Sequence, residues 1–205
     1  MKEELTLTRL HENSPVMVGI LPKPIFAEMK HWVKEARKVK DHPLGYLKAH
    51  ENVGYLSYDG KKHNSYQCSI PPHLIDNSYW LAWILRLCGK YYPLPANEHE
   101  ALHRNYMLRR YVGHFDHYDA WVNFAYKGDD NPTHNHAGML SGVIYVQNPE
   151  EEPVLFDQYG IGYAGQEGTM VLFPSQTFHH VERKKTRKER VTIAFNIVRR
   201  MNVGS

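Results

Sequence analysis

The spacing of apolar and polar residues predicts helices in the first half of the chain. Over residues 25–39, apolar positions recur every three or four residues and most positions between them are charged, as in an amphipathic helix packed on a core. Short extended pieces are predicted within 5–21, and residues 41–75 are rich in turn-forming residues. A second helix is predicted over 78–90, with a buried face of Leu81, Ile84, Leu85 and Cys88.

Beyond about residue 103 the pattern changes to the alternation of apolar and polar positions that strands show. Strand-like runs are separated by turns containing glycine, proline or asparagine, and the glycine-rich stretch 160–168 is expected to be flexible. Several short strands at roughly even spacing favour a β-sandwich or a jelly-roll barrel. The predicted strands are 106–111, 121–126, the segment around His134, 140–146, 154–156, 169–174 and 191–198.

The length of 205 residues is enough for one domain with a sizeable core. We expect a single domain over 1–205, with a helical and extended support region at 1–100 and a mainly β, jelly-roll core at 101–200. The net charge of +3 is mild and does not require a nucleic-acid partner.

The two cysteines, Cys68 and Cys88, provide no disulfide framework and match no zinc-ribbon spacing. The first residues lack the apolar core of a signal peptide, and no window approaches 18 continuous apolar residues. We therefore expect reduced thiols, a cytoplasmic location and no membrane span.

Candidate chemistry begins with His134 and His136, which are two positions apart ahead of a strand-like run. Residues at this spacing in a strand point to the same face, so both imidazoles can reach one point. Neutral imidazole is a common ligand for iron, zinc and copper. The alternative is a chance pair of surface histidines, since the chain contains 14 histidines.

A third ligand is expected at His179 or His180, which follow the segment Phe173-Pro174-Ser175. Adjacent residues on an extended backbone face opposite sides, so only one of the two histidines is expected to reach the metal. Three protein ligands with open positions are what a catalytic metal needs.

Arg190 and Thr192 lead the final apolar strand and are expected to point the same way. An inward-facing guanidinium binds a carboxylate through two parallel hydrogen bonds, and the threonine hydroxyl can share that anion. Alternatively, Arg190 is only the last charge of an exposed loop that contains Arg183, Lys184, Lys185, Arg187 and Lys188.

Taken together, these segments resemble the 2-oxoglutarate/Fe(II)-dependent oxygenases over about residues 120–198. They are most similar to a branch with His-x-His ahead of a Ser-Gly-Val-x-Tyr-Val strand, then Phe-Pro-Ser-x-x-x-His-x-Val, an arginine and Phe-Asn. The resemblance favours His179 over His180 as the ligand. The matching positions in this chain are His134, His136, 141–146, 173–175, His179, Val181, Arg190 and Phe195-Asn196.

The resemblance implies a double-stranded β-helix (jelly-roll, cupin-like) core. It implies Fe(II) bound by His134, His136 and His179, 2-oxoglutarate with its far carboxylate on Arg190 and Thr192, and O2 as the oxidant. The implied reaction is the oxidative decarboxylation of 2-oxoglutarate to succinate, coupled to hydroxylation of a substrate that the sequence does not identify.

One position departs from the family pattern, because the wider superfamily usually has Asp or Glu where this chain has His136. Either three histidines hold the iron, which we prefer on geometry, or another group completes the site. Neutral ligands alone would leave the site more positive by one charge. The candidate carboxylates are Asp116, Asp119, Asp130 and Asp157.

Further candidates for the cosubstrate pocket are Asn123, Ser141 and Tyr145. The segment Trp121-Val122-Asn123 matches the family pattern, and Asn123 could hydrogen-bond the cosubstrate or a ligand imidazole, or be a satisfied polar residue of the barrel. Ser141 and Tyr145 are an even number of positions apart and face one side, although core packing is the simpler interpretation of Tyr145.

Two other functions remain open from the sequence. A cupin-like dioxygenase would use the three histidines without 2-oxoglutarate. A non-catalytic binding protein would place the basic run 183–190 and Arg199-Arg200 on phosphates, but no aromatic interleaving or nucleic-acid motif accompanies these residues. We therefore expect an enzyme with a small-molecule cosubstrate and no nucleic-acid or membrane partner; the pattern indicates no oligomeric state.

Overall fold

The structure is a computed structural model, and its description covers most of the second half of the chain and selected segments of the first. The described residues are 7–40, 49–51, 66–70, 74–75, 78–81, 83–84, 87, 120–136 and 140–197.

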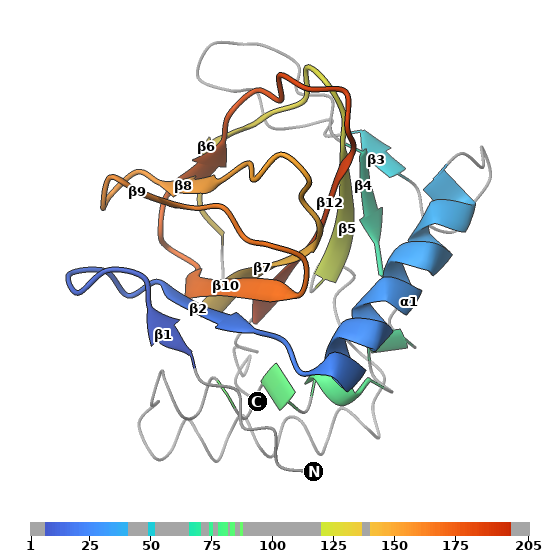
Figure 1. The fold of residues 1–205 in the computed structure, drawn as a ribbon, viewed down its shortest axis with the longest axis horizontal. Coiled ribbons are helices and arrows are strands. Elements are labelled where there is room, and N and C mark those ends of the chain that lie inside the picture. Colours follow the sequence, from blue (N-terminus) through green and yellow to red (C-terminus); the bar gives the residue numbers. More distant parts are fainter. Residues whose placement is uncertain are drawn as a thin grey trace, which may run out of the picture.

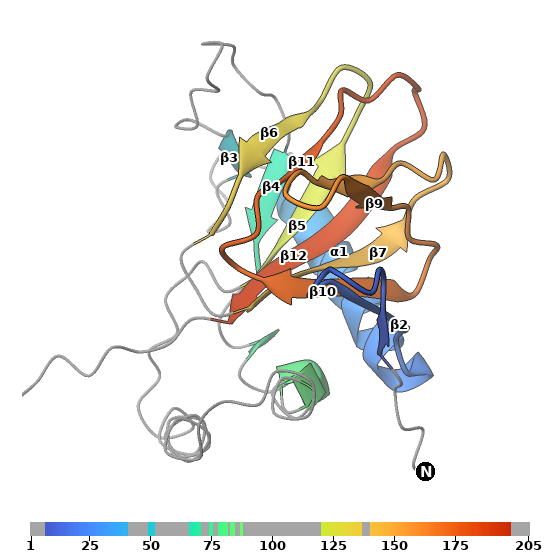
Figure 2. The same cartoon turned by 90° about the vertical axis from the view of Figure 1, so that its left-hand side faces the viewer.

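Within these residues two antiparallel sheets face each other (Figures 1 and 2). The large sheet has the order β1-β2-β10-β7-β12-β5-β4-β3, and the small sheet has the order β6-β11-β8-β9. The large sheet contains β1 (Thr8–Arg9), β2 (Met17–Ile20), β3 (Ala49–Glu51), β4 (Tyr66–Ser69), β5 (Ala120–Ala125), β7 (Leu140–Gln147), β10 (Thr169–Pro174) and β12 (Arg190–Ile197). The small sheet contains β6 (Asn131–His134), β8 (Val154–Phe156), β9 (Ile161–Tyr163) and β11 (His179–Val181).

From β5 onward the chain passes back and forth between the two sheets. β5, β7, β10 and β12 lie in the large sheet, and the strands between them in sequence lie in the small one. This winding produces the double-stranded β-helix that was expected, and the expectation of a mainly β fold with some helix is confirmed. β1 and β2 extend one edge of the large sheet, and β3 and β4 extend the other.

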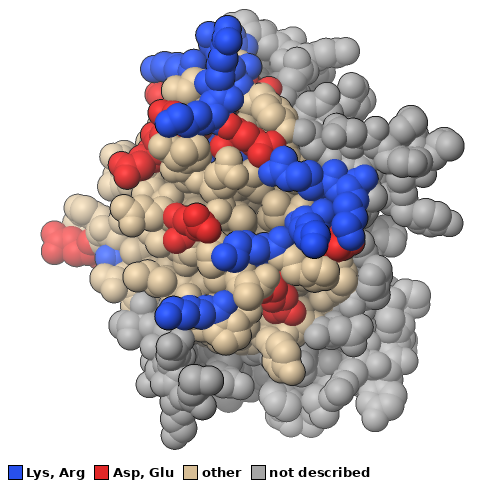
Figure 3. Space-filling view, turned by 45° about the vertical axis from the view of Figure 1, so that its right-hand side comes forward, with Lys and Arg blue, Asp and Glu red and all other residues tan. Residues whose placement is uncertain are grey.

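The helix α1 (Lys23–Lys40) covers the outer face of the large sheet beside β4 and β5 (Figure 1). Its apolar face includes Met29 and Trp32, which pack in one core with Val122 and Phe124 of β5. The opposite face is exposed and mainly basic, and its acidic residues are interspersed among the lysines and arginines (Figure 3). The amphipathic helix predicted over 25–39 is thereby confirmed.

A second, smaller core lies between the two sheets and supports the interior of the barrel. It contains Tyr145 of β7, Phe156 of β8 and Phe173 of β10, all with an exposed fraction of 1% or less. β7 is buried along almost its whole length because both of its faces are covered. Leu140, Ile144 and Val146 pack in the core shared with α1, and Tyr145 packs in the core between the two sheets.

The strands predicted at 121–126, 140–146, 154–156, 169–174 and 191–198 correspond to β5, β7, β8, β10 and β12 and are confirmed. Three strands were missed. β9 lies inside the glycine-rich stretch that was expected to be flexible, where Gly160 and Gly168 have positive φ angles of 61° and 84° and make turns before and after it. β3 and β4 are short, and both depend on tertiary pairing: β4 pairs with β5, and β3 pairs with β4.

Part of the second predicted helix is described. Residues 79–81, 83–84 and 87 are helical, and the predicted buried positions Leu81 and Ile84 are buried. The other predicted members of that face, Leu85 and Cys88, and the predicted strand 106–111 lie outside the described residues. The boundary between a support region and a core remains a prediction.

Cys68 is buried in the core that also contains Met29 and Trp32 of α1. None of the helices in the described part of the chain is both long enough and apolar enough to cross a bilayer.

Candidate metal centre and cosubstrate pocket

Three imidazoles converge inside the barrel from two strands of the small sheet and the turn after one of them. His134 ends β6, His179 begins β11, and the two are direct partners in the strand register. Their ring centroids are 4.3 Å apart, and those of His136 lie 4.9 Å from His134 and 5.2 Å from His179. Potential ligand atoms of all three histidines lie within 4.8 Å of one another.

The position of His136 differs from the geometry predicted from its spacing. β6 ends at His134, so the two histidines do not share the face of one continuous strand. Instead, the backbone N–H of His136 donates to the carbonyl of Ser175 over 2.9 Å, which ties the turn after β6 to the segment between β10 and β11. His136 therefore reaches the cluster from the segment that follows β6. The position of this segment depends on its hydrogen bond to Ser175, which is far away in the sequence.

The tautomers of two of the rings are fixed by local hydrogen bonds. Nδ1 of His134 lies 2.7 Å from the carbonyl oxygen of Pro132, and Nδ1 of His179 lies 2.9 Å from that of Thr177. A carbonyl oxygen only accepts, so Nδ1 carries the proton in both rings. Nε2 of each ring then has a free lone pair, which is the arrangement of metal-bound histidines.

The electrostatics also favour neutral imidazoles. Burial, together with a smaller effect of the neighbouring His134, lowers the pKa of His136 to about 4 and the pKa of His179 to about 3. Burial lowers the pKa of His134 as well. Three neutral nitrogen donors that lie within 4.8 Å of one another fit a divalent first-row metal such as Fe(II).

His180 faces the other side of β11, as expected for a neighbour of His179. Its Nδ1 lies 2.6 Å from Oδ1 of Asp157, so this carboxylate, a candidate for the third ligand in place of His136, belongs to a different pair. The second candidate carboxylate, Asp130, has its Oδ2 3.9 Å from Nε of Arg183. Among the described residues no carboxylate joins the three histidines, and Asp116 and Asp119 lie outside that part of the chain.

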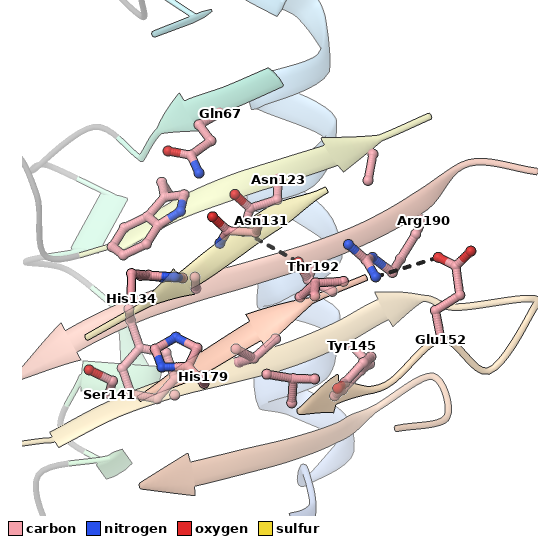
Figure 4. A pocket seen from close by; sticks show the side chains of 18 of the residues that line it. Gln67, Asn123, Asn131, His134, Ser141, Tyr145, Glu152, His179, Arg190 and Thr192 are labelled. Carbon is pink, nitrogen blue, oxygen red and sulfur yellow. Dashed lines mark hydrogen bonds and ion pairs between the residues drawn. The ribbon is translucent and has the colours of Figure 1, made fainter. Parts of the chain in front are cut away.

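A pocket extends from the histidines along the inner face of the large sheet (Figure 4). Gln67, Asn123, Thr192 and Tyr145 lie in one row across β4, β5, β12 and β7 and all line it. The side-chain amide of Asn123 donates to the hydroxyl of Thr192 over 3.3 Å. The row thus gives the pocket one polar wall.

Arg190 lies where β12 begins and also lines this pocket, with 10% of its side chain exposed. Burial lowers the pKa of its guanidinium, and the carboxylate of Glu152 opposes that change. Nη1 of Arg190 lies 3.4 Å from Oε2 of Glu152 (Figure 4). Arg190 is therefore not the last charge of an exposed loop.

The prediction that Lys184 is exposed with the rest of the basic loop is wrong. Arg183 and Lys188 are exposed, but none of the Lys184 side chain is, and its ammonium lies 2.8 Å from Oε1 of Glu152. The backbone explains the inward direction, because Lys184 N–H donates to the carbonyl of Asp129 over 2.7 Å and fixes the loop against the turn after β5.

Ser141 and Tyr145 line the pocket, but their hydroxyl groups already have partners in the barrel. The Ser141 hydroxyl lies 2.6 Å from Oδ1 of Asn196 and 2.9 Å from the hydroxyl of Ser175. The Tyr145 hydroxyl donates to the carbonyl of Tyr163 over 2.7 Å. Both residues hold strands together, and contact with a cosubstrate remains a prediction for them.

Three parts of the pocket were not predicted from the sequence. They are the side chains of Glu152 and Gln67 and the indole N–H donor of Trp121. The indole nitrogen of Trp121 is buried and has no hydrogen-bond partner among the described residues, and its ring lies 5.9 Å from that of His136. Buried N–H groups are normally satisfied, so this one is a donor that a bound ligand can use. Only the alternation of Trp121 with Asn123 along β5 carries a signal of this in the sequence.

Comparison with known proteins agrees with this geometry. Residues 156–196 match the model of a family described as "Putative 2OG-Fe(II) oxygenase". Over this segment the chain is similar to the 2OG-Fe(II) oxygenases. The segment contains His179, Arg190 and Thr192. No protein with a curated description matches the sequence.

Solved structures of 2OG-Fe(II) oxygenases share the fold. The chain is 13% identical to a prolyl-4-hydroxylase from Pseudomonas putida, with a TM-score of 0.54 and coverage of 91% of this chain and 94% of that one. It is also 13% identical to the viral collagen prolyl hydroxylase vCPH from Paramecium Bursaria Chlorella virus-1, with a TM-score of 0.51 and coverage of 91% and 97%. At these identities the likeness is one of fold.

The family expected from the sequence is thereby confirmed. Together with the three-histidine cluster, the family match confirms the predicted class of activity, an oxygenase that uses Fe(II), 2-oxoglutarate and O2.

Proposed function

We propose that His134, His136 and His179 hold Fe(II), and that Arg190 and Thr192 hold the far carboxylate of 2-oxoglutarate in the hydroxylation of a substrate C–H bond. The observation that carries the proposal is the pairing of two features within one pocket. Three neutral imidazoles, that of His179 buried and the other two half-buried, form a nitrogen donor set, and a buried guanidinium lies on the wall of the same pocket.

At the metal end the chain supplies neutral donors in fixed orientations. The carbonyls of Pro132 and Thr177 hold the protons of His134 and His179 on Nδ1, so that Nε2 faces the ion. When bound, iron supplies the redox chemistry that couples decarboxylation of 2-oxoglutarate to oxidation of the substrate. Three protein ligands leave positions for the cosubstrate and oxygen, and three neutral ligands leave the site more positive than the common set with one carboxylate.

At the cosubstrate end, Arg190 offers a planar fork of N–H donors that matches a carboxylate. The Thr192 hydroxyl oxygen accepts from the amide of Asn123, so its own proton remains available to donate to the same carboxylate. Asn123 therefore orients Thr192 toward the ligand. Val143, Val154 and Phe173 line the pocket as well and exclude water from around these charges.

The alternatives raised by the sequence are less well supported. A cupin-like dioxygenase without 2-oxoglutarate has no use for a guanidinium buried in the same pocket as the three histidines. A phosphate-binding surface along 183–190 is interrupted, since Lys184 and Arg190 are both buried. The structural neighbours named above are prolyl hydroxylases, and their activity supports hydroxylation as the outcome without identifying the substrate of this chain.

The test is an anaerobic titration of Fe(II) with and without 2-oxoglutarate, following the metal-to-ligand charge-transfer band. We expect the band in the wild type, its loss in His136→Ala, and a large weakening of 2-oxoglutarate binding in Arg190→Ala. Arg183→Ala is the matched control, because that side chain is 65% exposed, and it should keep the wild-type band. Absence of the band in the wild type would refute the proposal.

A further inference from the structure

Arg190 already faces a carboxylate inside the pocket. Glu152, from the segment between β7 and β8, directs Oε2 at Nη1 of Arg190 over 3.4 Å (Figure 4). Its other oxygen, Oε1, accepts from Nζ of Lys184 over 2.8 Å. The Glu152 side chain is 16% exposed and that of Lys184 is fully buried, so the three charges form one cluster screened from solvent.

The two contacts of Glu152 are unequal. The contact with Lys184 is a short, charge-assisted hydrogen bond, and the same ammonium also donates to the hydroxyl of Thr186 over 2.9 Å. Oε2, in contrast, is buried and accepts no hydrogen bond within the structure, so its interaction with Arg190 is electrostatic only. Glu152 is therefore anchored on Lys184 and only weakly attached to Arg190.

The backbone keeps this carboxylate in place. Glu152 N–H donates to Oδ1 of Asn148 over 3.2 Å, and the amide of Asn148 donates to the carbonyls of Glu152 and Gly165. Asp129, the other carboxylate near Arg190, accepts from the backbone N–H of Tyr126 over 2.7 Å. A ligand that binds Arg190 therefore meets Glu152 as a fixed negative neighbour.

We infer that Glu152 competes with the far carboxylate of the cosubstrate for Arg190, so that Glu152 sets cosubstrate affinity and Lys184 limits the competition. The inference rests on the proposed function, because it takes Arg190 as the anchor of a dicarboxylate. The attraction of Lys184 for Glu152 leaves the N–H donors of Arg190 free for the far carboxylate of the cosubstrate.

The inference predicts changes of opposite sign for two neighbouring substitutions. Glu152→Gln keeps the size of the side chain and removes the repulsion, so the Kd for 2-oxoglutarate should fall about tenfold. Lys184→Met releases Glu152 to pair fully with Arg190, so the Kd should rise about tenfold. General damage to the fold would weaken binding in both variants.

The experiment is an anaerobic calorimetric titration of the Fe(II)-loaded protein with 2-oxoglutarate and, separately, with pyruvate. Pyruvate has the same 2-oxo acid end but no far carboxylate, so its affinity should not change in either variant. Because Glu152→Gln leaves Lys184 without its carboxylate, the double variant Glu152→Gln with Lys184→Met is included. It lacks both the competitor and the orphaned cation and should bind 2-oxoglutarate at least as tightly as the wild type.

The possible failures are distinguishable. If the wild type binds 2-oxoglutarate but neither Glu152→Gln nor the double variant binds it more tightly, the inference is wrong while the proposed function stands. An equal tightening for pyruvate would place the effect at the metal end and would also overturn the inference. If the wild type binds pyruvate and not 2-oxoglutarate, the proposed function itself fails.

Discussion

His134 and His179 lie side by side as direct partners on the neighbouring strands β6 and β11 of the small sheet, with ring centroids 4.3 Å apart. Each ring directs Nδ1 to the backbone carbonyl two residues before it in the sequence. Two strands that are far apart in the chain thus present the same tautomer toward one point. Both strand register and hydrogen bonds to the backbone therefore hold this pair of the proposed metal centre in place.

Removing either member of this pair should abolish tight metal binding. We expect His134→Ala and His179→Ala to lower Fe(II) affinity by more than about a hundredfold, because even the loss of an outer hydrogen-bond partner of a ligand costs roughly 10–100-fold. Anaerobic metal titration measures this. His180→Ala, next to His179 but paired with Asp157, is the matched control and should bind metal as the wild type does.

His136 is the position at which this chain departs from the common pattern of two histidines and a carboxylate. If it is a ligand, His136→Ala should weaken Fe(II) binding by more than about tenfold, and His136→Asp should retain binding because it supplies a new donor at the same place. Wild-type metal affinity in His136→Ala would show that the third ligand lies elsewhere.

The buried imidazoles should make the stability of the metal-free protein depend on pH. Burial lowers the pKa of His136 to about 4 and of His179 to about 3, whereas a histidine in an unfolded chain titrates near pH 6.5. Between these values the unfolded chain binds more protons than the folded one. The stability present above about pH 6.5 is therefore lost as pH falls, by roughly 1.4 kcal/mol per pH unit for each group.

Urea unfolding of the metal-free protein at pH 7.5, 6 and 5 measures this dependence. His179→Asn removes one of the groups and should reduce the slope between pH 6 and 5, whatever it does to stability at pH 7.5. An unchanged slope in that variant would contradict the assigned cause.

Gly142 and Phe195, which both belong to the sequence motif, lie in close contact. A side chain at Gly142 would overlap the ring of Phe195, which is fully buried and packs edge-on against Trp80 at 4.9 Å. Gly142→Ala should lower the free energy of unfolding by about 1–3 kcal/mol, the usual cost of overpacking a core. Chemical denaturation tests this, and adding Phe195→Leu should restore part of the loss. No recovery in the double variant would show that another contact is responsible.

The motif residues could be predicted from the sequence because they sit where local rules are strong. The alternation of a strand predicts that only one of His179 and His180 reaches the metal, and the family resemblance selects His179, which the structure places with His134 and His136. Ser141 and Asn196, separated by 55 positions, are bonded to each other in the barrel, so the family motif records a single cluster of contacts. The strands β5, β7, β8, β10 and β12 were found because their apolar runs are long or end at clear turns.

The rest depends on contacts that no local pattern reveals. His136 reaches the cluster through a backbone bond to Ser175, and the short strands β3 and β4 take their order from β5. The inward turn of Lys184 comes from its bonds to the 128–129 turn and to Glu152, 32 positions earlier. In the run 183–190, which has five other basic residues, nothing in the sequence marks this lysine as different.

A crystal structure of the protein grown anaerobically with Mn(II) and N-oxalylglycine, an unreactive analogue of 2-oxoglutarate, tests the whole arrangement at once. We predict an anomalous peak within bonding distance of nitrogen atoms of His134, His136 and His179, and the far carboxylate of the analogue on Arg190 and Thr192. A metal held by a carboxylate in place of His136, or an analogue that leaves Arg190 untouched, would contradict the account.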